Sequence, residues 1–305
     1  MTENWTTDAM PSMEGKIVIV TGGNSGLGFQ SVKAFAEKGA KVVMACRNLL
    51  KGEDAKKEIV NTCAEAKIDV MHLDLTSLTS VRYFAEDFKK KYDRLDILLN
   101  NAGVMLGRYK LTEDGIEYQQ GTNHFGHFAL TAYLMENLKN TPKARVVNVS
   151  SIAHRRGVMD FDNLLFEGGK GYKPFKACGR SKLENLLFTF ELQRYFEKNQ
   201  LDIIALAAHP GVSYTNLFHQ FGAKHLQAVL KPLSDLFVQP AAMGALPQLR
   251  AATDEQAKAG EFYGPNGKWE MKGYPVVVDC SKTAKDKDVA RKLWEFSEKI
   301  TGVKY

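Results

Sequence analysis

The chain has 305 residues, of which 44% are hydrophobic and 25% are charged, and its formal net charge is +6. This composition is typical of a soluble globular protein with a full core, and the mild charge gives little support for a nucleic-acid partner. Residues 1–14 are polar and contain no apolar run long enough for a signal peptide or an integral membrane segment. The four cysteines lie far apart, without C-x-x-C or metal spacing, at Cys46, Cys63, Cys178 and Cys280. We therefore expect free thiols, no bound metal and a cytoplasmic protein.

Apolar runs alternate along the chain with amphipathic helical patterns. The patterns predict strands at 16–20, 41–45, 68–73, 95–99, 144–150 and 201–207, and helices at 26–38, 51–63, 77–91, 113–139 and 175–199. Short apolar strands without a polar face favour a parallel sheet that is covered on both sides. We therefore predict a single α/β domain over residues 1–305, with a doubly wound parallel sheet in a three-layer α/β/α arrangement.

Residues 213–240 interrupt this alternation after the sixth predicted strand. The segment is apolar and aromatic, and it includes Tyr214, Phe218, Phe221 and Phe237. An insertion beyond the carboxyl end of a strand is well placed to cover a ligand crevice. We expect this segment to form a substrate lid.

The first strand leads directly into TGGNSGLG at residues 21–28, which opens the first helix. Glycines let the backbone turn tightly and approach a ligand closely, and a helix N-terminus offers free N–H groups to a diphosphate. A tight turn also needs glycines when no ligand binds, but the strand-to-helix context favours a dinucleotide site. The residues expected to hold the cofactor here are Gly22, Asn24, Ser25, Gly26, Leu27 and Gly28.

The end of the second strand indicates which dinucleotide binds. An acid there usually meets the free ribose 2′-hydroxyl of NAD, whereas an arginine accommodates the 2′-phosphate of NADP. The sequence reads ACRN, with Arg47 and no acid before Glu53. A guanidinium can donate two hydrogen bonds to a phosphate, although the same residue could instead be a solvated loop residue. The sequence therefore favours NADP over NAD.

Further motifs follow in order: LDL at 73–75, NNAG at 100–103, TNHFGHF at 122–128, VVNVSS at 146–151, GRSKLEN at 179–185 and HPG at 209–211. With the glycine loop they make residues 12–305 resemble the short-chain dehydrogenase/reductase family, in its retinol-dehydrogenase-like and protochlorophyllide-reductase-like branch. The resemblance implies a single Rossmann-type domain with a seven-stranded parallel sheet, to which EFYG at 261–264 would supply the last strand. It also implies further cofactor contacts at Asp74, Leu75, Asn101, Ala102, Gly103, Lys182, Pro210, Gly211 and Thr215.

The resemblance assigns catalytic roles to three residues. Asn123 falls on the family's structural and proton-relay asparagine, and Ser151 on its substrate-orienting serine. Lys182 falls on the lysine that binds the nicotinamide ribose and lowers the pKa of a catalytic tyrosine in the pattern Y-x-x-x-K. Four residues before this lysine, however, the chain has Cys178 in the tyrosine position.

A second stretch, YKPFK at 172–176, also fits the letters of that pattern. Proline belongs in the first turn of a helix and not in its interior, so a helix should begin near Pro174. Tyr172 would then lie outside the helix, and it would not share a helical face with Lys176. We therefore assign the catalytic position to Cys178.

Reduction of a carbonyl group needs a general acid, and Cys178 stands where that acid should be. A thiol is shorter than a phenol and leaves a gap that water could fill. The nearby Lys182 and the helix N-terminus are expected to lower the pKa of the thiol and to favour a thiolate, which is a poor proton donor. The side chain could cripple a reductase, mark a protein that only binds cofactor, or carry an altered activity with water or Tyr214. It could also be a small buried hydrophobe that fills space.

We predict an NADP(H)-dependent oxidoreductase that interconverts an alcohol and a carbonyl on an apolar substrate, with activity impaired at Cys178. The substrate would be a lipophilic aldehyde, ketone or alcohol. The alternative is a catalytically inactive NADP-binding sensor or scaffold protein. The resemblance also allows a homodimer formed through the helices at 113–139 and 175–199.

Overall fold

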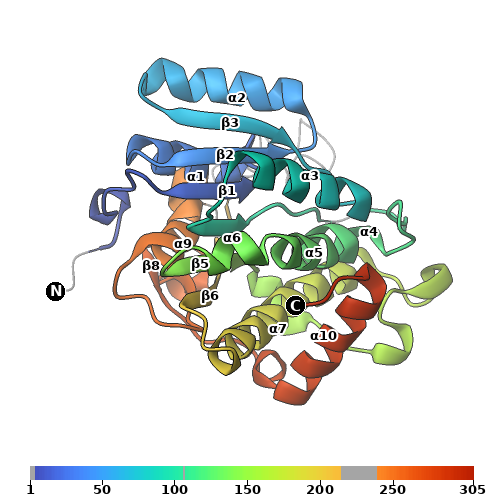
Figure 1. Cartoon of the computed structure of the whole chain (residues 1–305). Helices are drawn as coiled ribbons and strands as arrows, with labels where there is room; N and C mark the ends of the chain where they lie inside the picture. The colour runs from blue at the N-terminus through green and yellow to red at the C-terminus, as the bar shows by residue number, and fades with distance from the viewer. Residues whose placement is uncertain (1–3, 106, 214–238) are drawn as a thin grey trace, which may run out of the picture.

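One sheet of eight strands forms the centre of the molecule (Figure 1). The computed structural model describes residues 4–105, 107–213 and 239–305. The strands lie in the order β3-β2-β1-β4-β5-β6-β7-β8, and they span Ile17–Thr21 (β1), Lys41–Cys46 (β2), Lys67–His72 (β3), Ile97–Asn100 (β4), Ala144–Val149 (β5), Ile203–Ala208 (β6), Phe262–Pro265 (β7) and Pro275–Val277 (β8). Since β1 pairs with both β2 and β4, the winding direction reverses between them. Ligands of such sheets bind beyond the carboxyl ends of the strands at this switch point.

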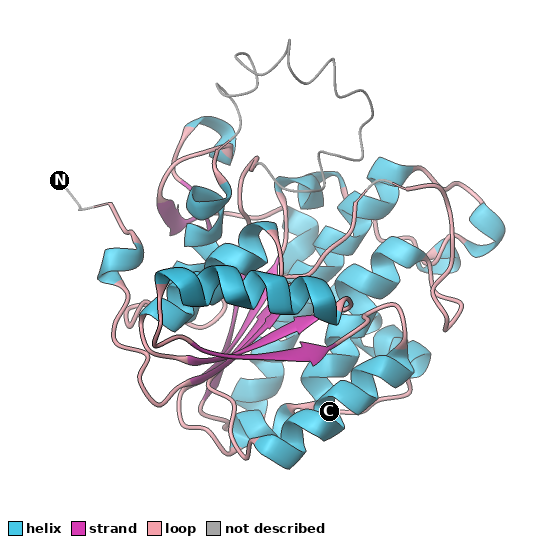
Figure 2. Cartoon of the chain, turned by 90° about the horizontal axis from the view of Figure 1, so that it is seen from above, coloured by secondary structure: helices cyan, strands magenta, loops and turns pink. Residues whose placement is uncertain are grey.

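Helices cover both faces of the sheet, and Figure 2 shows the strands between them. Side chains alternate along each strand, so Val18 and Val20 join one buried cluster while Ile19 joins the other. The first cluster packs against α1 (Gly26–Glu37), α2 (Leu49–Thr62) and α9 (Ala241–Thr253). The second packs against α3 (Leu78–Lys91), α5 (Gly126–Tyr133) and α7 (Pro174–Lys198). The predicted three-layer doubly wound fold is confirmed.

The remaining helical elements are short, apart from the C-terminal helix. They are η1 (Thr7–Ala9), α4 (Tyr118–Gln120), the π-helical η2 (Gly121–Phe125), α6 (Met135–Lys139), η3 (Ile152–Arg156), η4 (Phe161–Asn163), η5 (Glu167–Gly169), η7 (Lys268–Glu270), η8 (Lys282–Lys285) and α10 (Lys287–Thr301). Most of the predicted strands and helices are present, with ends that differ by a few residues.

The sequence analysis predicted seven parallel strands, but the sheet has an eighth strand. Residues 262–265 do form β7, parallel to β6, but an eighth strand follows and pairs antiparallel with β7. A parallel pair needs a crossover connection of a dozen or more residues, and the loop between β7 and β8 is shorter than that. The antiparallel hairpin is therefore the arrangement that its length permits.

The helix predicted over 113–139 is wrong at its start and interrupted later. Gly115 adopts a φ of +76°, and the N–H of Thr112 donates to the carbonyl of Ile116 at 2.8 Å, which makes a turn. The Glu117 carboxylate then accepts hydrogen bonds from the first free N–H groups, so the helix begins at Tyr118. The π-helical turn η2 follows directly. Such turns occur frequently at functional sites, and this one contains Asn123.

The C-terminal helix α10 packs across α7 and α5. The ring of Trp294 lies 5.3 Å from that of Phe128 and 4.4 Å from that of Tyr305, measured between centroids. The Tyr305 hydroxyl donates to the carbonyl of Phe128 at 2.8 Å. This aromatic packing covers a face of the two helices through which a homodimer was expected to form.

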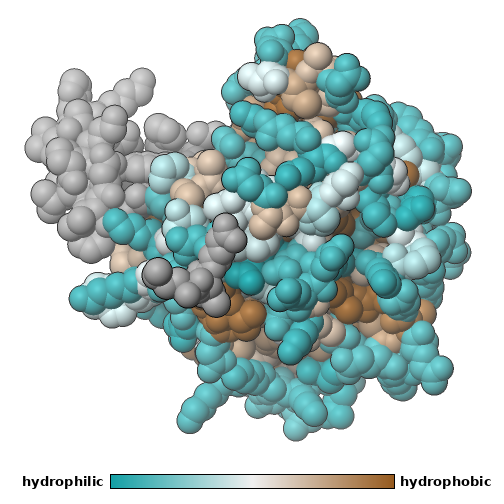
Figure 3. Space-filling view, turned by 90° about the vertical axis from the view of Figure 1, so that its left-hand side faces the viewer, coloured by the Kyte–Doolittle hydropathy of each residue, from teal (hydrophilic) through white to brown (hydrophobic). Residues whose placement is uncertain are grey.

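Figure 3 shows one side of the molecule, on which hydrophilic residues surround smaller hydrophobic areas. The most exposed large hydrophobic side chains, Leu50, Phe175 and Trp269, belong to three different elements. Single exposed hydrophobic residues are common on globular proteins. Within the described ranges, no helix combines the length and the apolar character needed to cross a bilayer.

Candidate active site

A cleft of about 320 Å³ opens beyond the carboxyl ends of β1, β2 and β4. It brings together twelve of the residues that the sequence predicted to bind a cofactor: Gly22, Asn24, Ser25, Gly26, Leu27, Gly28, Arg47, Asp74, Leu75, Asn101, Ala102 and Gly103. The sequence analysis missed other residues of its wall: Ala45, Cys46, Leu73, Thr76, Val104, Tyr118 and Thr122. Tyr118 and Thr122 lie at the start of a helix whose first residue was misplaced.

The glycine loop has the geometry of a close cradle. Gly22 has a φ of +66°, and a Cβ placed on it would lie 3.1 Å from the Cα of Ala102. A Cβ on Gly28 would lie 2.2 Å from the carbonyl oxygen of Gly22, so no other residue fits there. The first turn of α1 lines the cleft, and its N–H groups have no partners within the helix. The loop therefore fits a diphosphate.

Thr21 and His127 hold the opposite wall in place. The Thr21 hydroxyl oxygen accepts hydrogen bonds from the N–H groups of Asn101 and Ala102, both at 2.9 Å. His127 Nδ1 lies 3.0 Å from the carbonyl oxygen of Asn123 and must donate to it, so Nε2 accepts from the Thr21 hydroxyl at 2.9 Å. Burial lowers the pKa of His127 to about 4, which keeps this ring neutral. These contacts tie the 100–103 segment to β1.

Arg47 lies at one end of the cleft beside Tyr118. The Tyr118 side chain forms a hydrogen bond with Arg47 and raises the pKa of the guanidinium. The ammonium of Lys110 stands 3.4 Å from the centre of the Tyr118 ring, so a second cation lies near this end. The Asp74 carboxylate has only one oxygen left for a ribose hydroxyl. Its Oδ1 already accepts hydrogen bonds from the backbone N–H and the hydroxyl of Thr76.

Gly103, Asn123 and Lys182 meet at the other end. A Cβ built on Gly103 would lie 3.3 Å from Asn123 Oδ1 and 3.4 Å from Lys182 Nζ. Asn123 is buried, and its amide bonds both the N–H and the carbonyl of Val104, at 2.8 and 3.0 Å. Burial lowers the pKa of Lys182 to about 8, and the neighbouring Cys178 raises it by less. The structure thus brings two predicted catalytic side chains together beside Gly103, which lines the cleft.

Ser151 follows β5 and precedes η3. Its hydroxyl oxygen accepts from the N–H of Ala153 at 3.2 Å, which leaves the hydroxyl proton available. The adjacent Ser150 instead faces α7, where its hydroxyl donates to the carbonyl of Lys182 at 2.7 Å. Ser151 is partly exposed, unlike the buried Ser150. The Ser150 contact fixes the end of β5 against α7 and so positions Ser151 near Lys182.

The thiolate expected at Cys178 is wrong. The side chain is 3% exposed, and burial raises the pKa of its thiol by more than Lys182 lowers it. Because α7 begins at Pro174, Cys178 lies beyond the first turn, where the helix dipole has little effect. The residue is therefore a neutral thiol, one turn before Lys182 on the same helix.

Tyr172 lies outside the helix, as the position of Pro174 predicted. Its hydroxyl donates to the carbonyl of Gly107 at 2.9 Å and accepts from the Gln119 amide at 3.0 Å. These two contacts give Tyr172 a structural role in joining the segment before α7 to the start of α4.

Pro210 and Gly211 follow β6 and do not line the described cleft. Gly211 has a φ of +62°, and its N–H donates to His209 Nδ1 at 3.2 Å. The Pro210 carbonyl accepts from the Gln239 amide at 2.8 Å. Thr215 and Tyr214 lie outside the described residues, as does nearly all of the expected lid.

The sequence analysis missed a buried acid next to this site. Glu184 follows Lys182 in α7 and is fully buried, and the Gln120 amide donates to its Oε1 at 2.6 Å. Burial raises the pKa of Glu184 to about 8, so the carboxyl group is largely protonated at neutral pH. Its position on the inner face of α7 could have been found from the helical spacing.

The comparisons with known proteins agree with this geometry. Residues 16–162 match the family model described as short chain dehydrogenase. Mouse retinol dehydrogenase 12 is 38% identical over 298 residues, which cover 95% of this chain and 88% of the mouse protein. The chloroplastic short-chain dehydrogenase TIC 32 B of Brassica napus is 38% identical over 296 residues, which cover 92% of this chain and 87% of the plant protein.

A solved structure from Mycobacterium Paratuberculosis, of an uncharacterized protein, is 39% identical. It superposes with a TM-score of 0.83 over 99% of both chains. The identity to the retinol dehydrogenases and the coverage of nearly the whole chain are sufficient to assign a family. The chain therefore belongs to the short-chain dehydrogenase/reductase family, in its retinol-dehydrogenase-like branch.

Proposed function

We propose that this protein is an NADP(H)-dependent oxidoreductase that interconverts an alcohol and a carbonyl group on an apolar substrate. The observation that carries the proposal is that Asn123 and Lys182 meet beside Gly103, which lines one end of a cleft whose other end holds Arg47. The glycine loop would bind the diphosphate between these two ends. Bound NADPH would supply the hydride.

The choice of NADP over NAD rests on Arg47. Its guanidinium lies in the cleft wall beside Tyr118, with Lys110 stacked on the same ring. Two cations at this end favour a ligand that carries a phosphate there. Asp74, which could otherwise serve a ribose hydroxyl, is engaged with Thr76 through one oxygen.

The nicotinamide end would be held by Lys182 on the ribose and by Pro210, Gly211 and Thr215 on the carboxamide. The Ser151 hydroxyl would donate to the carbonyl oxygen of the substrate, and Asn123 would support a water relay towards Lys182. These groups would therefore bind the cofactor, orient the substrate or transfer a proton.

The general-acid position holds a neutral thiol that is buried and far shorter than a phenol. Among the described residues, the Cys178 thiol is free and no hydrogen bond fixes the direction of its proton. We therefore propose that turnover is low compared with a relative that has tyrosine there. Loss of a positioned general acid typically costs about 10²–10⁴ in rate.

The relatives named for retinol support an apolar alcohol or aldehyde as the substrate. The aromatic composition of residues 213–240 points the same way. A long-chain or isoprenoid aldehyde should be turned over faster than a small polar ketone. The opposite preference would contradict this part of the proposal.

The second candidate is a protein that binds NADP without catalysis, and the missing tyrosine favours it. Both candidates predict that NADPH binds, which protein thermal shift and NADPH fluorescence detect. Only the enzyme consumes NADPH when lipophilic aldehydes are added, which absorbance at the nicotinamide band detects. Binding without consumption, over a wide range of aldehydes and ketones, would select the second candidate.

A cytoplasmic location and a homodimer complete the proposal. A pair formed through α5 and α7 would have to include α10 or displace it, because α10 packs on both helices. Size-exclusion chromatography with light scattering measures the oligomeric state, and cell fractionation measures the location.

A further inference from the structure

The turn between β7 and β8 is built around two residues in the left-handed region. Trp269 has φ of 55° and Glu270 has φ of 58°, and neither is glycine. The Trp269 side chain is 68% exposed, so burial of the ring does not compensate for the strained backbone. Strained backbone of this kind persists where contacts with the surrounding structure hold the residue in place. Glu270 makes such contacts.

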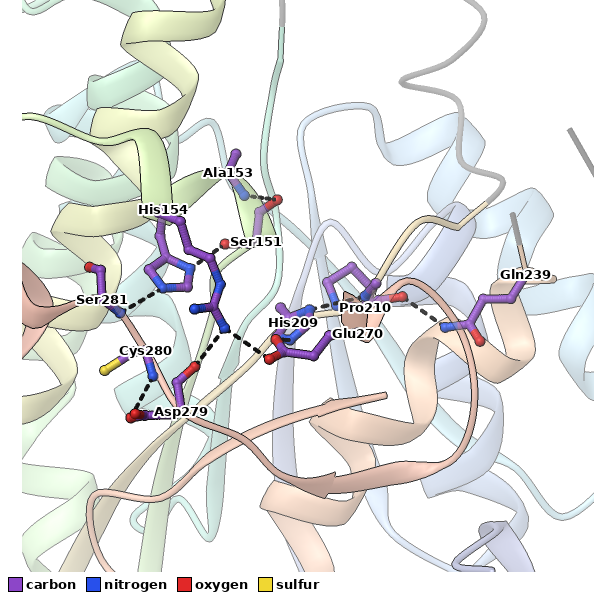
Figure 4. A network of polar contacts seen from close by, with 12 residues as sticks. Ser151, Ala153, His154, His209, Pro210, Gln239, Glu270, Asp279, Cys280 and Ser281 are labelled. Carbon is purple, nitrogen blue, oxygen red and sulfur yellow. Dashed lines mark hydrogen bonds and ion pairs between the residues drawn. The ribbon is translucent and has the colours of Figure 1, made fainter. Parts of the chain in front are cut away.

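Glu270 places its carboxylate between two side chains from other segments, as Figure 4 shows for His209. Its Oε2 lies 3.0 Å from His209 Nε2, and its Oε1 accepts from Arg155 at 2.8 Å. His209 Nδ1 accepts from the N–H of Gly211, so the ring proton is on Nε2 and is donated to Glu270. Both carboxylate oxygens therefore have a donor.

His209 is enclosed by the surrounding structure. The residue is fully buried, and a Cβ placed on Gly264 would lie 2.1 Å from its Nε2. The same turn also holds the loop after β6 through its backbone, since the N–H of Val212 donates to the carbonyl of Met271 at 2.7 Å. The Pro210–Gly211 loop is thus fixed from the β7–β8 turn by one side chain and by the backbone.

Arg155 carries the connection to the Ser151 loop. It lies in η3, and besides Glu270 it donates to the carbonyl of Asp279 at 2.9 Å. The neighbouring His154 accepts from the N–H of Ser281 and donates through Nδ1 to the carbonyl of Ser151 at 2.7 Å (Figure 4). The segment 270–281 therefore contacts both loops that flank the proposed nicotinamide end.

We propose that Glu270 is a positioning residue that sets the Pro210–Gly211 loop relative to the Ser151 loop, and thereby places the nicotinamide of the cofactor against the substrate oxygen. This inference rests on the proposed function. Glu270 acts through His209 and Arg155 and does not itself touch the cofactor. Its loss should weaken binding of the nicotinamide half of NADPH and leave the adenosine half unaffected, because that half lies at Arg47.

The test compares two ligands by calorimetry, NADPH and 2′,5′-ADP, which lacks the nicotinamide half. The variants are Glu270→Ala and Glu270→Gln, and Asp87→Asn is the control because it changes an exposed ion pair with Lys90. We expect Glu270→Ala to weaken NADPH binding by about tenfold or more, as misplacement of a bound group by an ångström is costly. The affinity for 2′,5′-ADP should stay within about twofold. Glu270→Gln should be intermediate, since one amide oxygen must serve two donors.

The inference is overturned if NADPH binds the Glu270 variants as tightly as the wild type. It is also overturned if both ligands weaken equally, because general damage to the fold would do that. If Glu270→Ala does not fold, Glu270→Gln and Arg155→Lys give the same comparison. A wild-type protein that binds neither ligand would contradict the proposed function itself, which separates the two failures.

Discussion

The ammonium group of Lys182 donates to the backbone carbonyl of Val149 at 2.9 Å, where β5 ends. Asn185, nearly one turn further along α7, donates to the same carbonyl at 3.0 Å. The contact holds Lys182 against the end of β5, because Val149 lies two residues before Ser151 in the chain. Within the described part of the chain, Lys182 has no carboxylate partner, so its charge is held in the site without compensation.

Lys182→Met should therefore stabilise the protein at neutral pH while weakening NADPH binding. The unfolded chain keeps the lysine proton up to its ordinary pKa of 10.5, whereas the folded protein releases it near 8. Between these values the unfolded state binds more protons, so wild-type stability rises with pH there. The melting temperature of Lys182→Met should exceed that of the wild type at pH 7, and the difference should shrink towards pH 10. A constant difference would contradict this, and the exposed Lys282→Met is the control.

Glu184→Gln should show a pH dependence of the opposite sign. The folded protein holds the Glu184 proton up to about pH 8, but the unfolded chain releases it near its ordinary pKa of 4.5. Wild-type stability from this group is thus present below pH 4.5 and is lost as the pH rises to 8. Thermal unfolding should show little difference at pH 4.5 and a more stable variant at pH 8. Equal differences at both pH values would refute this burial effect, and the exposed Glu295→Gln provides the baseline.

Cys178→Tyr should restore the missing general acid. NADPH-dependent reduction of a lipophilic aldehyde should rise by about 10²–10⁴, as expected for a positioned acid. Cys178→Ala is the matched control, and its turnover should stay at the wild-type level because the thiol is not the proton donor. Unchanged turnover in Cys178→Tyr, with the variant folded and binding NADPH, would show that the cysteine does not limit the rate.

Arg47→Ala should change the choice of cofactor. Removal of a charged hydrogen bond to the 2′-phosphate should raise the Kd for NADPH roughly tenfold to a hundredfold. The Kd for NADH should change little, because NADH has no phosphate there. Calorimetry measures both values, and Arg82→Ala on the surface of α3 is the control. An equal loss for the two cofactors would assign Arg47 a different role.

The sequence was sufficient for the parallel part of the sheet and for twelve of the residues that line the cleft. Short apolar runs located β1, β2 and β5, because parallel strands that are buried on both faces are nearly continuous in hydrophobic residues. The glycine loop could be predicted since Gly22 and Gly28 occupy positions where no side chain fits. Pro174 marked the start of α7 for an equally local reason.

The errors arose where side-chain contacts or burial, which hydrophobic patterns do not report, decide the structure. The start of the helix at Tyr118 depends on the Glu117 cap, which periodicity does not report. The protonation of Cys178 depends on burial, which outweighs the attraction of Lys182. Neither the contact of Tyr118 with Arg47 nor that of Glu270 with His209 follows from spacing, because their partners lie far away in the chain.

The most direct test of this account is calorimetric titration of the folded wild-type protein with NADPH, NADP, NADH and NAD. The account predicts binding of one NADPH per chain and weaker binding of NADH. If circular dichroism shows folded protein and none of the four forms binds, the glycine loop holds no dinucleotide and the account is contradicted.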